Sequence, residues 1–193
     1  MAGFKAGSNI VCPMYGAGTV EEIIKEKIEK NIQDFLKIKL IHSNLELLIP
    51  VDMIEPNGIR PISSESQLLR ALKILKKDPT KMDDEEAREI TANINTIIKG
   101  SDIVTCAKWV SKLIYRRRHH GQLNASEKKL YLNFKSLICG ELAIIKKMTF
   151  KDAEKQLEKV LKKNFSLTDK DIELLGLDDS VDEEETKSAP AEE

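Results

Sequence analysis

The chain has 193 residues, a length that suits one or two small domains, each with its own core. Hydrophobic residues make up 41% of it and charged residues 33%, which excludes an intrinsically disordered chain. No apolar run approaches the roughly 18 residues that a membrane helix needs, and the first residues lack the apolar stretch of a signal peptide. We therefore expect a cytoplasmic protein with no membrane partner.

The formal net charge of −1 hides an uneven distribution along the chain. Residues 1–62 carry seven basic and eight acidic side chains, whereas residues 63–177 carry 23 basic and 16 acidic ones. The last residues, 178–193, contain eight acids and one base. This pattern predicts a near-neutral first module, a basic middle module and an acidic disordered tail.

The first module has the pattern of short β-strands. Leu36, Ile38 and Leu40 alternate with Lys37 and Lys39, as in a strand with one buried face. The strands are expected over residues 9–12, 19–28, 35–41 and 45–49, with a hairpin turn at Ser43-Asn44. Four or five strands in about sixty residues predict a small curled sheet or barrel.

After Pro61 the apolar residues recur with the period of an α-helix. Each expected helix begins at a residue that can cap free N–H groups, and Asn124 followed by Glu127 has the spacing of a capping box. The expected helices cover residues 64–75, 83–100, 103–118, 124–147 and 149–163, and either Ser101 or Asp102 caps the third of them. The sequence thus predicts a two-domain α+β chain, with a β domain over 1–62 and an all-α helical bundle over 63–165. Residues 166–177 could add a short helix before the acidic tail.

The sequence offers no catalytic or metal-binding pattern. His42 stands alone, and the neighbours His119 and His120 would point about 100° apart on a helix, which makes them poor joint ligands. No Cys or His spacing matches a zinc site, no glycine-rich phosphate loop follows a strand, and three widely spaced cysteines fit a reducing compartment. We expect neither an enzyme nor a metal, cofactor or small-molecule ligand.

The helix expected over 103–118 has an apolar face and a basic face. Lys108, Lys112 and Arg116 recur every four residues opposite the apolar positions. The candidate phosphate-contacting residues are Arg88, Lys108, Lys112, Arg116, Arg117, Arg118, Lys128 and Lys129. Charge alone leaves a nucleic acid, an acidic protein partner and an ordinary solvated helix face as alternatives.

The strand expected over 45–49 breaks its own alternation. If Leu45, Leu47 and Ile49 face inward, Leu48 faces outward beside Glu46. Leu48 is then either covered by another part of the chain or exposed as a contact at a sheet edge.

A series of short motifs resembles, in the same order, the CarD/CdnL-type bacterial transcription regulators. In the first module the matching motifs are Phe4-Lys5-x-Gly7, Val11-x-Pro13-x-x-Gly16-x-Gly18-x-Val20-Glu21, Leu45-x-x-x-Ile49-Pro50 and Gly58-Ile59-Arg60. In the second module they are Ala92-Asn93 with Gly100, Arg116-Arg117, Leu123-Asn124-x-x-Glu127-Lys128 and Gly140-Glu141-Leu142-Ala143. The similarity extends over about residues 3–163.

The resemblance implies a Tudor-like N-terminal domain that binds the β subunit of RNA polymerase, similar to the polymerase-binding domain of transcription-repair coupling factors. It also implies a helical domain that contacts promoter DNA without sequence specificity and stabilises open promoter complexes. Leu48 matches a polymerase-contacting position, so Leu48, Glu46 and Leu47 are the candidate polymerase-binding residues. The expected protein is a monomer at the nucleoid; the alternative is a protein-only adaptor on RNA polymerase with little or no DNA binding.

The chain departs from the family pattern near the start of the second expected helix. Well-known members place a DNA-wedging tryptophan there, followed by two basic residues. Glu86 takes the place of that tryptophan here, and Arg88 and Glu89 take the basic positions. Because acids repel phosphate, the candidate DNA contacts shift to the basic residues of the later helices.

Overall fold

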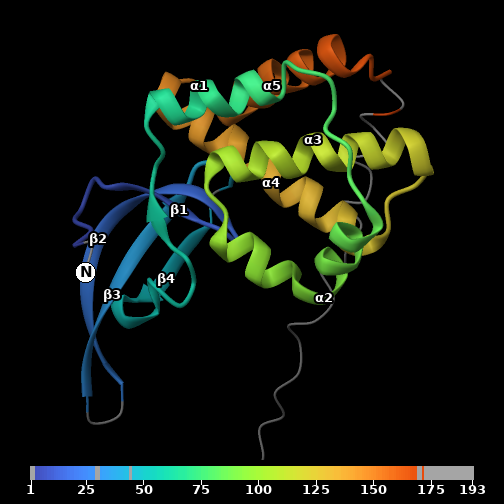
Figure 1. Cartoon of the computed structure of the whole chain (residues 1–193). Coiled ribbons are helices and arrows are strands. Elements are labelled where there is room, and N and C mark those ends of the chain that lie inside the picture. The colour runs from blue at the N-terminus through green and yellow to red at the C-terminus, as the bar shows by residue number, and fades with distance from the viewer. Residues whose placement is uncertain (1–2, 29–30, 44, 169–170, 172–193) are drawn as a thin grey trace, which may run out of the picture.

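The computed structural model describes residues 3–28, 31–43, 45–168 and 171. An antiparallel sheet is followed by a bundle of helices, so the chain is a two-domain α+β protein, as predicted (Figure 1). The strands are β1 (Asn9–Cys12), β2 (Gly16–Ile28), β3 (Asn31–Leu40), β4 (Glu46–Pro50) and β5 (Arg60–Pro61), with a 3₁₀ turn, η1 (Val51–Met53), after β4. The helices are α1 (Glu65–Ile74), α2 (Asp84–Gly100), α3 (Ile103–His120), α4 (Ala125–Lys146) and α5 (Phe150–Phe165).

The five strands are ordered β4-β3-β2-β1-β5. Leu36, Ile38 and Leu40 are buried while Lys37 and Lys39 point away from the core, which confirms the predicted alternation. The β2–β3 hairpin is longer than predicted, because its backbone pairing continues past the apolar residues that periodicity detects. Strand β5, which pairs with β1, was not predicted.

The helix starts follow the predicted caps. A side-chain oxygen accepts a hydrogen bond from the third N–H of each helix. The caps are Ser64, Asp83, Asp102, Asn124 and Thr149. Helix α3 runs two residues beyond the expected Arg118 and ends before Gly121, whose φ of 86° favours glycine. Helix α2 contains a break at Asn93 (φ −132°, ψ 24°) that the periodicity did not indicate.

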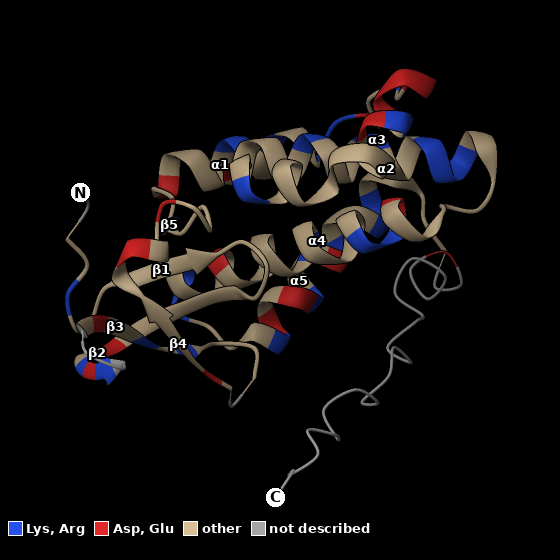
Figure 2. Ribbon diagram, turned by 90° about the horizontal axis from the view of Figure 1, so that it is seen from below, with Lys and Arg blue, Asp and Glu red and all other residues tan. Residues whose placement is uncertain are grey.

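Helix α4 is the centre of the molecule. It packs against α2, α3 and α5 and also against β1 and β2 (Figures 1 and 2). Its apolar residues, including Leu130, Phe134 and Leu142, are fully buried. The predicted apolar face of α3 is buried against it as well. A single helix thus holds the sheet and the other helices together.

Some predicted features lie outside the described residues. These are Asn44 of the predicted hairpin turn, the acidic residues 178–193, and most of the expected short helix over 166–177. In the described part of the chain, no helix combines the length and the apolar character needed to cross a lipid bilayer.

Candidate nucleic-acid and polymerase interfaces

The two central cations of the predicted basic face on α3 are held in ion pairs. Lys112 contacts the carboxylate of Glu86 on α2, and its ammonium lies 5.5 Å from the centre of the Trp109 ring. Arg116 lies 3.3 Å from Asp84 on α2 and also pairs with Glu127 on α4. Lys108, Lys112 and Arg116 therefore do not form the single solvent-facing row that the helical spacing indicated.

The reason lies in the helix starts. Asp84, Glu86 and Glu127 occupy the first turns of α2 and α4, where acids oppose the positive end of the helix dipole. The Oε2 of Glu86 also accepts a hydrogen bond from the N–H of Asp83, at 3.3 Å. The folded arrangement turns these acids toward α3, where they pair with Lys112 and Arg116.

The other candidate phosphate-contacting residues differ in their exposure to solvent. Lys108, Arg118 and Lys129 are exposed, and Figure 2 shows basic residues gathered where α3 ends. Arg117 donates a hydrogen bond to the carbonyl of Gly121 at 3.1 Å. Lys128 is half-buried at the start of α4. Of these candidates, the exposed ones lie on α3 and at the beginning of α4.

Arg88 lies apart from that group. It is exposed on α2, its Nε donates to the carbonyl of Asp84 at 3.2 Å, and it lines an open groove of about 600 Å³. Arg116, Thr91 and Asn124 line the same groove. The structure therefore brings Arg88 and Arg116 together beside the beginning of α4.

Strand β4 presents an apolar side chain at a sheet edge. It pairs with β3 alone among the described strands, and Leu48 is 45% exposed. Leu47 packs on the sheet core and Ile49 is buried, as expected, while Glu46 is exposed with its carboxylate 3.3 Å from Lys37. Leu45 is also exposed, contrary to the inward position considered for it, because β4 begins only at Glu46. Leu48 is therefore exposed at the sheet edge and not covered by another described part of the chain, and its role as a contact stays a prediction.

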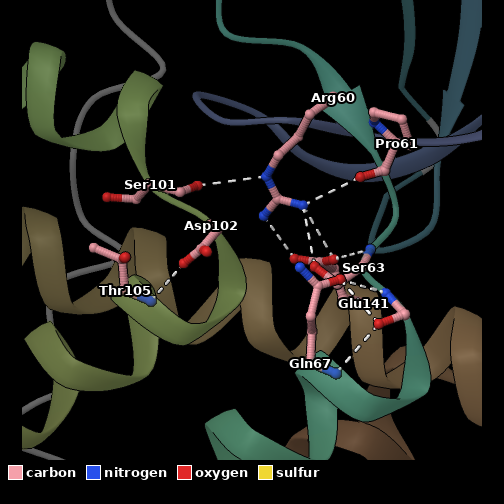
Figure 3. Close-up of polar contacts among 9 residues, drawn as sticks. Arg60, Pro61, Ser63, Gln67, Ser101, Asp102, Thr105 and Glu141 are labelled. Carbon is pink, nitrogen blue, oxygen red and sulfur yellow. Dashed lines mark hydrogen bonds and ion pairs between the residues drawn. The ribbon is translucent and has the colours of Figure 1, made fainter.

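A buried ion pair joins the sheet to the helices (Figure 3). Glu141 of α4 is fully buried. The two terminal nitrogens of the Arg60 guanidinium on β5 donate hydrogen bonds to its two carboxylate oxygens, at 2.7 and 3.1 Å. The N–H of Ser63 donates to the same carboxylate at 2.7 Å, and Arg60 Nε donates to the carbonyl of Ser101 at 3.4 Å. Burial alone would lower the pKa of Arg60, but its hydrogen bonds to Glu141 raise the pKa above the ordinary value.

Neither the periodicity nor the spacing of charges along the chain indicates this pair. An acid within the apolar run of α4 is the one signal that could have pointed to a buried partner, because Glu is seldom fully buried unless paired. Two more contacts lie in the same interface. A Cβ on Gly140 would be 2.8 Å from the Cβ of Ala17, and Asn133 donates to the carbonyl of Pro13 at 2.9 Å. Helix α4 therefore lies directly on the β1–β2 hairpin.

The described residues contain no group of three or more His, Cys, Asp or Glu side chains able to hold a metal ion. Cys12, Cys106 and Cys139 are buried and free. Burial raises the pKa of Cys12 and Cys139 to about 12, so both thiols are protonated at neutral pH. These cysteines are therefore core residues.

The chain is thus a two-domain protein, in which a sheet with an exposed edge strand, β4, is fixed to a helical bundle with exposed basic residues. Residues 4–63 match the family model of the CarD-like/TRCF RID domain, and residues 70–158 match that of the CarD C-terminal domain. The chain is also 33% identical over 156 residues to "Putative transcription factor YdeB" of Bacillus subtilis (strain 168), a match that covers 80% of this chain and 97% of that protein. The chain belongs to the CarD family of transcription regulators.

Proposed function

We propose that this regulator binds the β subunit of RNA polymerase through strand β4 and promoter DNA through its helical domain, and thereby stabilises open promoter complexes. The observation that carries the proposal is the exposed apolar Leu48 on an edge strand of a CarD-like/TRCF RID domain. The protein would act as a monomer in the cytoplasm, at the nucleoid, and would read no particular base sequence.

The edge of β4 suits a partner that adds a strand. Backbone N–H and C=O groups at such an edge can pair with an extended segment of another chain, and side chains on alternate positions give specificity. Leu48 supplies the apolar contact, Leu47 anchors the strand on the sheet core, and Glu46 and Lys37 form a charged rim. The RNA polymerase β subunit is the partner that the domain match favours.

Leu48→Arg tests this interface. We expect the substitution to weaken binding to the isolated polymerase β subunit by at least about tenfold, because a charge would replace an apolar contact. Leu69→Arg on α1 is the matched control, since Leu69 is 49% exposed and carries the same substitution on the other domain. Both variants should keep the wild-type circular dichroism spectrum. Equal pulldown of wild type and Leu48→Arg would refute the interface.

Binding to DNA would depend on charge and not on a wedging side chain. Lys108, Arg118 and Lys129 are exposed and basic, whereas the wedge position holds Glu86. Phosphate contacts release counterions, so affinity for a duplex should fall steeply as salt rises. A gel shift with the full chain and with a Lys108→Glu, Arg118→Glu, Lys129→Glu variant tests this: affinity should fall in the variant. Equal affinity at low and high salt would contradict it.

A second candidate function is a protein-only adaptor on RNA polymerase. The ion pairs of Lys112 with Glu86 and of Arg116 with Asp84 and Glu127 favour it, because they neutralise the centre of the basic helix. Gel shifts with and without the acidic residues 178–193 separate the two functions. An adaptor binds no duplex in either form, whereas a DNA-binding regulator binds at least in the shortened form.

A further inference from the structure

Helix α5 carries a row of lysines along its outer side. Lys151, Lys155, Lys159 and Lys163 are all exposed and recur every four residues. The buried residues of the same helix, Ala153, Leu157, Leu161 and Phe165, recur with the same spacing and are 0% exposed. An offset of two residues corresponds to about 200° around a helix, so the lysine row lies opposite the buried row along the whole of α5.

The carboxylates of α5 have partners outside that row. Glu154 and Glu158 lie 3.1 and 2.9 Å from the ammonium of Lys135 on α4. Burial would lower the pKa of Lys135, but its hydrogen bonds to these two carboxylates raise the pKa above the ordinary value. Asp152 accepts the hydroxyl hydrogen bond of the capping Thr149 at 2.7 Å. The three acids of α5 are therefore engaged with α4 or with the helix cap.

The lysine row differs in this respect from the basic face of α3. Lys112 and Arg116 on α3 have carboxylate partners from α2 and α4. The row on α5 runs from Lys151 to Lys163, a rise of twelve residue steps or about 18 Å along the helix axis. Phosphates of one DNA strand are spaced about 3.4 Å along the duplex axis, so the row is long enough to lie along several of them.

The outer side of α5 has no large exposed apolar side chain that could form the centre of a protein–protein interface. Protein–protein interfaces have apolar or aromatic cores. No α5 residue belongs to the exposed large hydrophobic side chains of the described structure, whereas α1 exposes Leu69. An outer side that is basic and without such a side chain is complementary to a polyanion.

We propose that the lysine row of α5 (Lys151, Lys155, Lys159 and Lys163) contacts the phosphate backbone of duplex DNA without reading its sequence. This inference rests on the proposed function, since it assigns the DNA-binding role to a particular surface. The proposed DNA contacts of the helical domain then include α5 as well as the basic residues of α3 and α4.

The test is the salt dependence of duplex binding by the full chain. Fluorescence anisotropy with a mixed-sequence duplex gives the slope of log affinity against log salt concentration, which changes by about 0.9 for each phosphate contact. The variant replaces the four lysines together (Lys151→Gln, Lys155→Gln, Lys159→Gln, Lys163→Gln), and we expect its slope to be shallower than that of wild type by about 2 to 4. Replacement of the same lysines by arginine should keep the wild-type slope.

A matched control removes the same charge from α1 and the turn that follows it. The residues are Arg70, Lys73, Lys76 and Lys77, which are exposed, each replaced by Gln. The control should keep a slope close to that of wild type, and thermal melts should show that all variants are folded. Equal losses in the α1 and α5 variants would overturn the inference, because net charge alone would then explain both.

Two further outcomes separate this inference from the proposed function. A wild-type slope in the α5 variant, together with lost binding on charge reversal at Lys108, Arg118 and Lys129, would overturn the inference and leave the proposed function standing. Absence of duplex binding by wild type, with and without residues 178–193, would overturn both.

Discussion

Arg60 and Glu141 are 81 residues apart in sequence, yet their side chains form a two-point ion pair between strand β5 and helix α4. One partner belongs to the sheet domain and the other to the central helix of the bundle. Because the carboxylate also accepts a hydrogen bond from the N–H of Ser63, the pair fixes the chain between the end of the sheet and the start of α1. The proposed function, in which the sheet and the helical domain bind different partners, needs such a junction to hold the two surfaces at a constant separation.

Glu141→Gln should destabilise the protein strongly. The substitution keeps the shape of the side chain but leaves the guanidinium of Arg60 without its counter-charge, at a cost of about 3 kcal/mol in the free energy of unfolding. Urea unfolding followed by circular dichroism measures the change. Glu65→Gln is the control, because Glu65 pairs with Lys146 at the surface, where solvent screens the ion pair and the loss should be much smaller. Equal losses in both variants would show that the buried pair contributes no more than a surface pair.

Gly140→Val should loosen the contact between α4 and the sheet. A Cβ at this position would already lie 2.8 Å from the Cβ of Ala17, so the larger side chain must push the β1–β2 hairpin away. We expect a loss of about 1–3 kcal/mol in thermal or urea unfolding.

Gly100→Val is the matched control for that substitution, because a Cβ on Gly100 would meet no atom within 4 Å. Adding Ala17→Gly to Gly140→Val should restore part of the lost stability. If the two glycine variants were equally stable, close packing of α4 on the sheet would not be what requires glycine at position 140.

His42 should make the stability depend on pH below neutrality. Its ring lies 5.7 Å from that of Phe150 at the start of α5, and partial burial lowers its pKa below the ordinary value of about 6.5. The unfolded state then binds the proton more readily than the folded state, so this contribution is present at pH 7 and is lost as the pH falls through about 6.5 and then through the lower folded pKa.

Melting temperatures at pH 7.5 and 5 measure this effect. The decrease on acidification should be smaller in His42→Gln than in wild type, since glutamine does not titrate. An identical decrease in both proteins would mean that His42 makes no contribution to the pH dependence.

The local structure was largely predictable from the sequence, and the contacts between elements were not. Asp83, Asn124 and Thr149 were recognised as helix starts because a cap depends on residues three positions apart. The outward position of Leu48 was likewise considered from its neighbours in one strand. Both features depend on residues that are only a few positions apart in the sequence.

The ion pairs were missed because they join distant segments. A helical wheel shows Lys112 and Arg116 on one face of α3, but it cannot show that the acids of α2 and α4 will face them in the fold. The same holds for Arg60 and Glu141. Periodicity therefore indicated where the basic residues are, and only the packing of helices showed which of them are neutralised.

The measurement that tests the central proposal most directly is the lifetime of open promoter complexes after a heparin challenge. RNA polymerase with its housekeeping sigma factor is assembled on a promoter fragment alone, with the wild-type protein, with Leu48→Arg or with Leu69→Arg. We predict that wild type and Leu69→Arg lengthen the lifetime and that Leu48→Arg leaves it at the value of polymerase alone. A lifetime that the wild-type protein does not change, or that Leu48→Arg lengthens equally, would contradict the proposed function.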